Sequence, residues 1–216
     1  MLAGPPDGED VAEHEGAAVI AIVDYRAGNL TSVKKALDRV GVESFVASDP
    51  QQIATAEKIV LPGVGHFAAT QVLTTGGMRS AIAEAIGREV PFLGICVGMQ
   101  WLFENSEESP ETAGLGLFPG KCEHFPLAVK SPHVGWNDLT RYRPSQLLAG
   151  VPQNSFVYFT HTYRAPVGLG SVAQCEYGGT FSAAVERGRV FGVQFHPEKS
   201  GEVGLTILRN FLELPC

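Results

Sequence analysis

Three consecutive pieces of this 216-residue chain are Val90-Pro-Phe-Leu-Gly-Ile95, Cys96 and Val97-Gly-Met-Gln-Trp-Leu-Phe-Glu104. The first piece is an apolar run typical of a buried strand, and the last has the composition of a helix. A cysteine at such a strand-to-helix corner, between Gly94 and Gly98, is typical of a nucleophile elbow. The two glycines let the backbone turn sharply, and the start of a helix favours a thiolate. The sequence therefore predicts covalent acyl chemistry at Cys96.

By itself the elbow pattern has a second interpretation, a tight turn that carries a buried and unreactive thiol. The segment His196-Pro197-Glu198 favours the catalytic interpretation, because a cysteine nucleophile needs a base and a group that orients the base. It follows an apolar run at 190–195 that predicts a strand. In an extended chain, residues two apart point to the same side, so His196 and Glu198 suit a pair. The alternative for this pair is an ordinary surface turn.

The first half of the chain alternates patterns typical of strands and of helices. Short apolar runs predict buried strands, and they lie at 18–23, 44–47 and 58–61. Helical spacing or helix-start residues follow each run, at 30–40, from Asp49-Pro50 onward, and at roughly 67–88 with a break at Gly76-Gly77. This alternation predicts right-handed strand–helix–strand units and a mostly parallel central sheet flanked by helices.

Ligands of such sheets lie beyond the carboxyl ends of the strands, where both Cys96 and the P-G-V-G segment at 62–65 fall. Glycines in that segment allow exposed backbone N–H groups, which an oxyanion hole requires. We expect Gly63 and Val64 to provide one side of the hole, and the amide of Val97 the other. The alternative for this segment is an ordinary turn.

The second half of the chain has a different character. Its apolar segments are short, β-rich and separated by glycine and proline, near 119–125, 137–142, 155–160, 171–177, 183–187 and 190–195. Arg187-Gly188 between two of them predicts a hairpin, and the spacing at 200–212 predicts a closing amphipathic helix. The fold class expected is therefore α/β, with a mostly parallel sheet and a β-rich C-terminal half.

Composition excludes several classes of protein. The chain is 44% hydrophobic and 18% charged, which gives no sign of disorder or of a membrane span. Its net charge of −7 argues against nucleic acid as the main ligand. The four cysteines and six histidines show no metal-ligand spacing, so we expect no metal site and no cofactor. Reduced thiols in a chain of this size favour a cytoplasmic location.

The first residues differ from the rest. Residues 1–16 are rich in glycine, proline and acidic side chains and lack the pattern of a signal peptide. We expect them to form a flexible tail, and residues 17–216 to form one domain, because no linker or internal repeat divides them.

Three motifs together resemble the class I glutamine amidotransferase family, over about residues 19–212. They are P-G-V-G-H-F (62–67), G-I-C-V-G-M-Q (94–100) and Q-F-H-P-E-K-S (194–200). More narrowly, four segments resemble the glutaminase subunits of imidazole glycerol phosphate synthases: D-Y-R-A-G-N-L-T-S-V (24–33), L-P-G-V-G-H-F (61–67), P-H-V-G-W-N (132–137) and H-P-E-K-S-G (196–201). The chain departs from the family pattern at Arg26, where many members have glycine, and its N-terminal tail has no counterpart.

The resemblance implies a flavodoxin-like class I glutaminase fold and hydrolysis of glutamine to glutamate and ammonia. Cys96 would form a γ-glutamyl thioester, His196 would transfer protons, and Glu198 would orient His196. Gln100 lies four residues after Cys96, on the same helical face, and it matches a position that contacts substrate in the family. Glu108 matches another such position.

The resemblance also implies a partner, a (β/α)₈-barrel cyclase subunit that receives the ammonia. With it, imidazole glycerol phosphate and AICAR would be made from PRFAR in histidine biosynthesis. Asn29, Trp136 and Lys199 lie in segments that look like the family's contact segments, so we expect them at the interface.

Three other functions stay open at this point. One is a glutaminase subunit of another pathway, although the S-x-G-P-G-like loop of the anthranilate type and the G-G-E-S of the pyridoxal-phosphate type are absent. Another is a γ-glutamyl hydrolase of the same fold, which would need no partner. The third is a catalytically silent scaffold, against which the intact cysteine, histidine and glutamate argue.

Overall fold

The computed structural model describes residues 19–26, 29–141 and 143–215. The expected tail at 1–16 lies outside them, as does Cys216. One large sheet crosses the molecule, with strand order β2-β1-β3-β4-β12-β11-β10-β7-β8. The strands are β1 (Ile20–Val23), β2 (Ser44–Ala47), β3 (Lys58–Gly63), β4 (Phe92–Cys96), β7 (His133–Arg141), β8 (Ser155–His161), β10 (Ser171–Glu176), β11 (Thr180–Arg187) and β12 (Val190–Val193).

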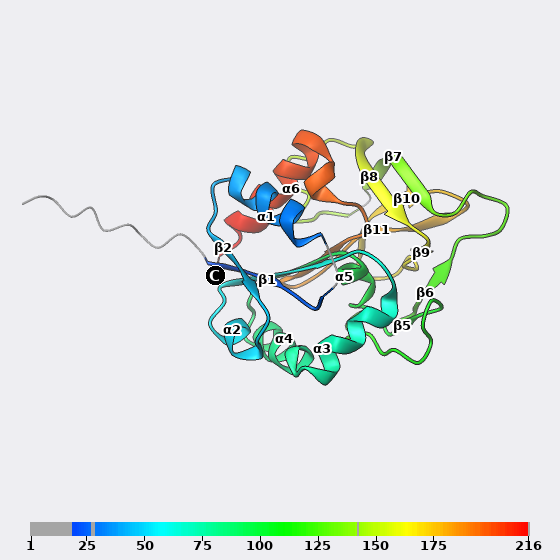
Figure 1. Ribbon diagram of the computed structural model, residues 1–216. Helices are drawn as coiled ribbons and strands as arrows, with labels where there is room; N and C mark the ends of the chain where they lie inside the picture. The colour runs from blue at the N-terminus through cyan, green and yellow to red at the C-terminus, as the bar shows by residue number, and fades with distance from the viewer. Residues whose placement is uncertain (1–18, 27–28, 142, 216) are drawn as a thin grey trace, which may run out of the picture.

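The first five strands of this order form the parallel half of the sheet. Every residue of β1, β3, β4 and β12 is buried. Helices cover both faces here, which explains why these strands are continuous apolar runs rather than alternating ones. On one side lie α1 (Leu30–Arg39) and α6 (Gly201–Glu213) (Figure 1).

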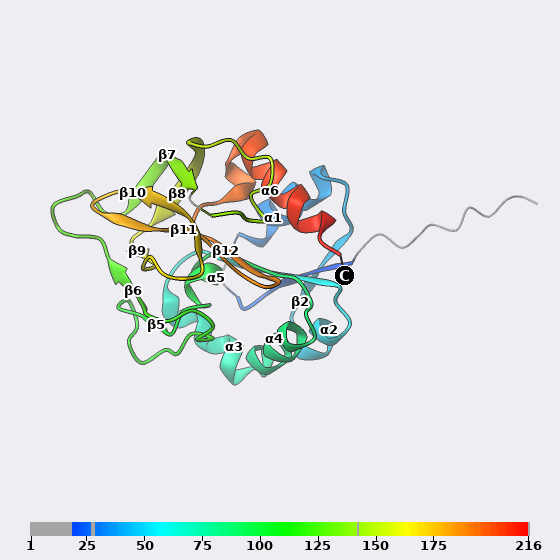
Figure 2. The ribbon, with the colours of Figure 1, turned by 180° about the vertical axis from the view of Figure 1, so that it is seen from behind.

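The opposite face is covered by α2 (Pro50–Ala54), α3 (Gln71–Thr75) and α4 (Met78–Gly87), and the view from behind shows the same layers (Figure 2). A 3₁₀ turn, η1 (Phe67–Thr70), precedes α3. The predicted helix start at Asp49 is confirmed, because its side chain and that of Gln52 form a reciprocal capping box.

The second half of the chain continues the sheet with antiparallel strands, as its β-rich pattern predicts. The β11–β12 hairpin turns at Gly188, whose φ of 59° suits glycine. A small second sheet contains β5 (Asn105–Ser106), β6 (Lys121–His124) and β9 (Tyr163–Arg164), and the sequence patterns give no signal for β5 or β9. The predicted fold class is confirmed.

One predicted element is shorter than expected. The helix expected over 97–104 is a single turn, α5 (Val97–Gln100). Beyond it, the carbonyls of Trp101, Leu102 and Phe103 accept hydrogen bonds from backbone amides within 114–118. A helix through these residues would need those carbonyls for its own bonds, so the pairing with a later segment ends it.

Over the described residues, no helix is both long and apolar enough to cross a membrane.

Candidate active site

Cys96 is the last residue of β4 and directly precedes α5, at the carboxyl end of the parallel strands. Its φ of 54° and ψ of −108° lie in a region that side-chain-bearing residues rarely adopt. Such strain persists only where the surroundings hold it, and it is common at active sites. The backbone therefore has the sharp corner that the sequence predicts.

The two flanking glycines are required by close backbone approach. A Cβ on Gly98 would lie 1.9 Å from the carbonyl oxygen of Leu61, and one on Gly94 would lie 2.4 Å from the carbonyl oxygen of Gly98. Since both obstacles are backbone atoms, no side-chain adjustment relieves them. The corner packs against β3 at a distance that only glycine permits.

The sulfur of Cys96 lies in polar surroundings, although the residue is only 3% exposed. Its Sγ lies 3.9 Å from the carbonyl oxygen of Thr160, toward which the thiol donates. The side-chain Nε2 of Gln194 donates to Sγ over 3.6 Å. The sequence patterns assigned no role to Thr160 or Gln194.

His196 and Glu198 form a buried pair. The Nδ1 atom of His196 lies 2.8 Å from Oε1 of Glu198, and each side chain is 1% exposed. The expected extended chain between them is wrong, because Pro197–Lys199 forms a 3₁₀ turn, η2. The turn brings the two side chains together by curling the backbone, with Pro197 at its first position.

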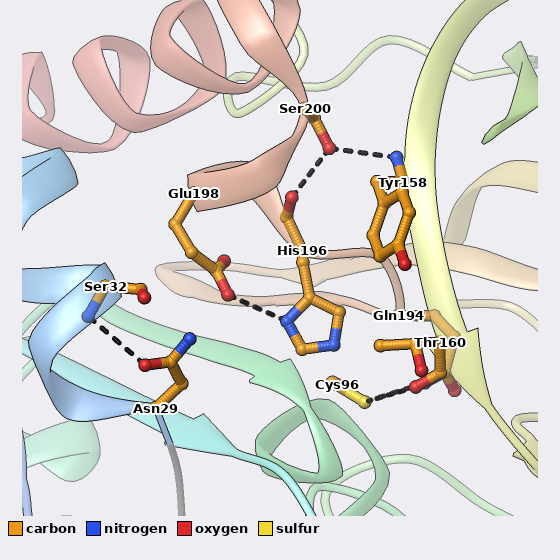
Figure 3. A network of polar contacts seen from close by, with 9 residues as sticks. All are labelled: Asn29, Ser32, Cys96, Tyr158, Thr160, Gln194, His196, Glu198 and Ser200. Carbon is orange, nitrogen blue, oxygen red and sulfur yellow. Dashed lines mark hydrogen bonds and ion pairs between the residues drawn. The ribbon is translucent and has the colours of Figure 1, made fainter. Parts of the chain in front are cut away.

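The other ring nitrogen of His196, Nε2, is buried and has no hydrogen-bond partner among the described residues. Figure 3 shows this nitrogen on the side of the ring that faces Cys96 and Gln194. Burial opposes protonation of His196, but Cys96 and Glu198 outweigh it and raise the pKa of the imidazole to about 10. A positive imidazolium next to sulfur stabilises the thiolate form.

The other described cysteines lack this setting. Burial raises the pKa of the Cys175 thiol to about 12, and burial likewise raises the pKa of Cys122. A thiol that stays protonated is a poor nucleophile. Cys96 is therefore the described cysteine with the surroundings of a nucleophile.

The backbone of His196 is tied to strand β8. Its N–H donates to the carbonyl of Tyr158 at 2.9 Å. The buried hydroxyl of Ser200 accepts from the N–H of Tyr158 at 3.0 Å and donates to the carbonyl of His196 at 2.6 Å (Figure 3). These contacts hold the histidine against a strand that lies about forty residues earlier in the chain, and no sequence pattern indicated them.

The expected oxyanion segment lies beside the elbow. Gly63 ends β3 and is paired in register with Cys96 of β4. Val64 and Val97 both line the pocket that contains Cys96. Val97 begins α5, and the first amides of a helix have no partner within it. The structure therefore brings all three expected residues to the nucleophile.

A pocket of about 270 Å³ opens at Cys96. Gln100 and Glu108, the expected substrate contacts, both line it. Glu108 also accepts a hydrogen bond from the backbone N–H of Phe67 through Oε2, at 2.7 Å. Residues that the sequence patterns missed complete the wall: Pro132, Thr160, His161, Thr162 and Tyr163. Among the described residues, no group of histidine, cysteine and acidic side chains is arranged to hold a metal.

Two of the three expected interface residues share one surface. Trp136 is 54% exposed, and its ring meets that of Tyr158 edge-on at 6.1 Å. Lys199 is exposed, and its Nζ lies over the ring of the same Tyr158, 5.7 Å from the ring centroid. Asn29 is half-buried, and its side chain caps α1 by accepting from the Ser32 N–H. It lines a small cavity together with His196 and Glu198.

Arg26, the departure from the family pattern, has a φ of 64°. This is the left-handed region, which glycine adopts more readily than a residue with a side chain. Its N–H donates to the side chain of Asp24 at 2.7 Å, a local bond that supports the turn.

Comparison with known proteins agrees with this geometry. Residues 21–214 match the family model of the class-I glutamine amidotransferases. The chain is 47% identical over 201 residues to the imidazole glycerol phosphate synthase subunit HisH of Moorella thermoacetica, covering 90% of this chain and 94% of that one. It is 48% identical to the HisH of a Synechococcus species over 91% of this chain and 94% of the other.

Solved structures show the same fold at lower identity. PurLQS from Thermotoga maritima matches with a TM-score of 0.73 at 22% identity, over 91% of this chain and 98% of that chain. A structure described as a glutamine amidotransferase matches with a TM-score of 0.71 at 21% identity, over 90% and 97%.

The strained cysteine corner, the buried histidine–glutamate pair and these matches place the chain in the class I glutamine amidotransferase family. Within that family, it belongs with the HisH subunits of imidazole glycerol phosphate synthase.

Proposed function

We propose that this chain hydrolyses glutamine to glutamate and ammonia through Cys96, His196 and Glu198, and supplies the ammonia to a cyclase subunit in histidine biosynthesis. The observation that carries the proposal is the meeting of Cys96, on a strained corner, with the buried His196–Glu198 pair beside a pocket the size of an amino acid. We assign this activity to one domain at 17–216, in the cytoplasm.

In the first half of the reaction, the Cys96 thiolate attacks the carbon of the substrate's side-chain amide. The amide oxygen becomes an oxyanion, which the backbone N–H groups of Val64 and Val97 stabilise. The imidazolium of His196 then gives its proton to the leaving nitrogen, so that ammonia departs and a γ-glutamyl thioester remains.

In the second half, neutral His196 takes a proton from water, and the hydroxide attacks the thioester. The carbon–sulfur bond breaks, glutamate leaves, and the thiolate and imidazolium are restored. Glu198 accepts from Nδ1 throughout, so that Nε2 is the nitrogen that exchanges the proton.

Recognition of glutamine, rather than of any amide, needs groups that match its amino and carboxylate ends. Glu108 provides a carboxylate on the pocket wall for the ammonium group, and its bond from Phe67 fixes its orientation. Gln100 lies on the same wall, near the nucleophile. These two side chains suit a free amino acid.

The face of β7 and β8 that carries Trp136 suits the cyclase. Val134, Trp136 and Phe156 are each more than half exposed, and strand alternation and register put them on one face. Large exposed apolar side chains in one patch mark interaction surfaces. Thr160 lies on the same face opposite Val134 and also lines the active-site pocket, so this docking face reaches the nucleophile. We propose a (β/α)₈ barrel as the partner there.

The test is glutamine hydrolysis by the chain alone and with a cyclase subunit, alongside cyclisation driven by free ammonia. We expect little hydrolysis by the chain alone and strong stimulation by the cyclase with its substrate. Full hydrolysis without a partner would instead indicate a γ-glutamyl hydrolase. No hydrolysis in either state, with ammonia-driven cyclisation intact, would indicate a silent scaffold.

A further inference from the structure

Gln194 follows β12 and is fully buried, with 0% of its surface exposed. Its side-chain amide lies between two residues of the active site. The Nε2 atom lies 3.6 Å from the sulfur of Cys96, and the Oε1 atom lies 3.1 Å from Nε2 of Gln100 (Figure 3 shows Gln194 beside Cys96). The reaction as described above gives this side chain no part.

The role of Gln194 depends on whether its amide nitrogen or its amide oxygen faces the sulfur. The two atoms have nearly the same shape, so their assignment must follow from the hydrogen-bond partners. The chain of bonds starts at the backbone carbonyl of Tyr163, which can only accept. Gln100 lies 2.7 Å from it through Nε2, so the amino group of Gln100 must point there.

That amino group has a second hydrogen, and it is directed at Gln194. Gln194 must therefore present its oxygen to Gln100 and its own amino group to the sulfur. The orientation of the Gln194 amide is thus fixed by the backbone carbonyl of Tyr163, through two successive hydrogen bonds. Both glutamines are buried, at 2% and 0% exposure, so water does not compete for these hydrogens.

The groups around the sulfur have opposing effects. The carbonyl of Thr160 accepts from a thiol and repels a thiolate, whereas an N–H donor favours the thiolate. A hydrogen bond to an ionised partner is about twice as strong as a neutral one. The amide of Gln194 provides such a donor, and unlike His196 it never gives up its proton during the reaction.

We propose that Gln194 is a further catalytic residue, which donates an amide hydrogen bond to the Cys96 thiolate before attack and again when the thiolate leaves the thioester. This inference rests on the proposed function, because it assigns a role within that reaction. The positioning residue for Gln194 is Gln100, in addition to its place on the substrate pocket wall.

The test compares two replacements that differ in charge. Gln194→Glu keeps the shape and the acceptor for Gln100 but loses the donor and adds an anion. Gln194→Met removes both polar groups with a similar volume. If Gln194 only fills space, Gln194→Glu is the milder change. If it stabilises the thiolate, Gln194→Glu is the more harmful one. Gln174→Met, in β10 of the same sheet, is the matched control.

The measurement is the pH dependence of Cys96 alkylation by iodoacetamide in the full chain bound to its cyclase, with Cys96→Ala as the background. We expect alkylation at neutral pH to fall roughly 10- to 100-fold in both variants, the range of a hydrogen bond to a charged group, with the larger loss for Gln194→Glu. Complex formation should match the wild type, which shows that the variants fold, and ammonia-driven cyclisation by the cyclase should be unchanged.

An unchanged alkylation profile in folded variants overturns the proposal, whatever happens to turnover. A smaller effect of Gln194→Glu than of Gln194→Met also overturns it. Failure of the proposed function is distinguishable, because it would appear as glutamine turnover that survives Cys96→Ala, a result independent of how fast Cys96 is alkylated.

Discussion

His196 and Tyr158 are joined along their backbones, directly by one hydrogen bond and again through the hydroxyl of Ser200. Tyr158 belongs to β8, and its ring contacts Trp136 and Lys199 on the proposed docking face. The residue proposed to transfer protons is therefore held by the strand that would meet the partner. Displacement of β8 on docking would move the His196 backbone with it.

Ser200→Ala removes one of these two connections. We expect kcat for glutamine to fall while KM changes little, since Ser200 contacts the backbone of His196 and not the substrate pocket. The Tyr158 N–H would lose its partner, at a cost of about 1–3 kcal/mol of stability for a buried unpaired group, whereas the His196 carbonyl would keep the hydrogen bond from the N–H of Lys199. Steady-state kinetics of the complex measures the first effect, and urea unfolding the second.

Ser200→Thr keeps the hydroxyl and should restore most of kcat. The control is Ser155→Ala at the other end of β8, whose hydroxyl donates to the carbonyl of Pro152. A fall in kcat for Ser155→Ala equal to that of Ser200→Ala would contradict a specific role in holding His196.

Cys96→Ala should abolish glutamine hydrolysis and leave partner binding and ammonia-driven cyclisation intact, because the corner is shaped by backbone and glycines. Cys96→Ser should be nearly inactive as well, since a serine hydroxyl forms far less anion near neutral pH. A coupled assay for glutamate measures both. Cys122→Ala and Cys175→Ala are the controls, and an inactive control with an active Cys96→Ala would exclude the assigned nucleophile.

His196 and Glu198 should differ in the size of their effects. His196→Ala removes the group that transfers protons, a loss of about 10²–10⁴-fold in kcat. Glu198→Gln keeps a hydrogen-bonding side chain at the same place, so it should be the milder change. Free ammonia should bypass both defects in the complex. A collapse of ammonia-driven cyclisation in either variant, with the complex intact, would show a role outside glutamine hydrolysis.

The folded chain should lose stability in mild acid because of a buried histidine pair. Nδ1 of His133 lies 3.3 Å from Nε2 of His161, and burial lowers the pKa of His133 to about 4 and that of His161 to about 3. In the unfolded chain both titrate near their ordinary value of about 6.5. Below that pH the unfolded state takes up protons that the folded state does not, so stability falls with decreasing pH.

The expected slope is at most about 1.4 kcal/mol per pH unit for each histidine between pH 6.5 and 4. Urea unfolding at a series of pH values measures it. His161→Gln should have a shallower slope over this range, whereas His66→Gln, at an exposed position, should not change it. Equal slopes for wild type and His161→Gln would contradict a buried neutral pair.

Trp136→Ala and Lys199→Ala should weaken the coupling between subunits. Both side chains contact the Tyr158 ring on the proposed docking face. The measurement is the ratio of glutamine-driven to ammonia-driven turnover in the complex, which should fall several-fold while ammonia-driven turnover is largely kept. Leu169→Ala, an exposed apolar residue outside β7 and β8, is the control. An unchanged ratio would indicate that the interface with the cyclase lies elsewhere on the molecule.

The sequence was informative where local pattern decides structure. The corner at Cys96, the helix start at Asp49 and the hairpin at Gly188 each depend on a few neighbouring residues, and the structure has all three. The triad candidates came from motifs, and the structure brings their side chains together even though the chain at His196 curls where an extended segment was expected.

The sequence was uninformative where the contact joins distant segments. Ser200 accepts a hydrogen bond from Tyr158 of β8, and Gln194 donates to Cys96, almost a hundred residues away. The helix α5 is short because the residues after it pair with the segment at 114–118. A serine or a glutamine has many possible partners, and only the folded backbone selects one. Such polar contacts are therefore the part of the site that a single sequence leaves open.

Strand β8 is the last strand of the large sheet, so one side of it has no neighbouring strand. At Tyr158 both backbone groups on that side are already bonded, to Ser200 and to His196. A sheet edge with free groups is a template for pairing with other chains, which leads to aggregation. The segment that carries His196 thus covers the edge of β8 at Tyr158. Detachment of this segment would displace His196 and free the backbone groups of Tyr158 together, so loss of the active site and exposure of a sheet edge would coincide.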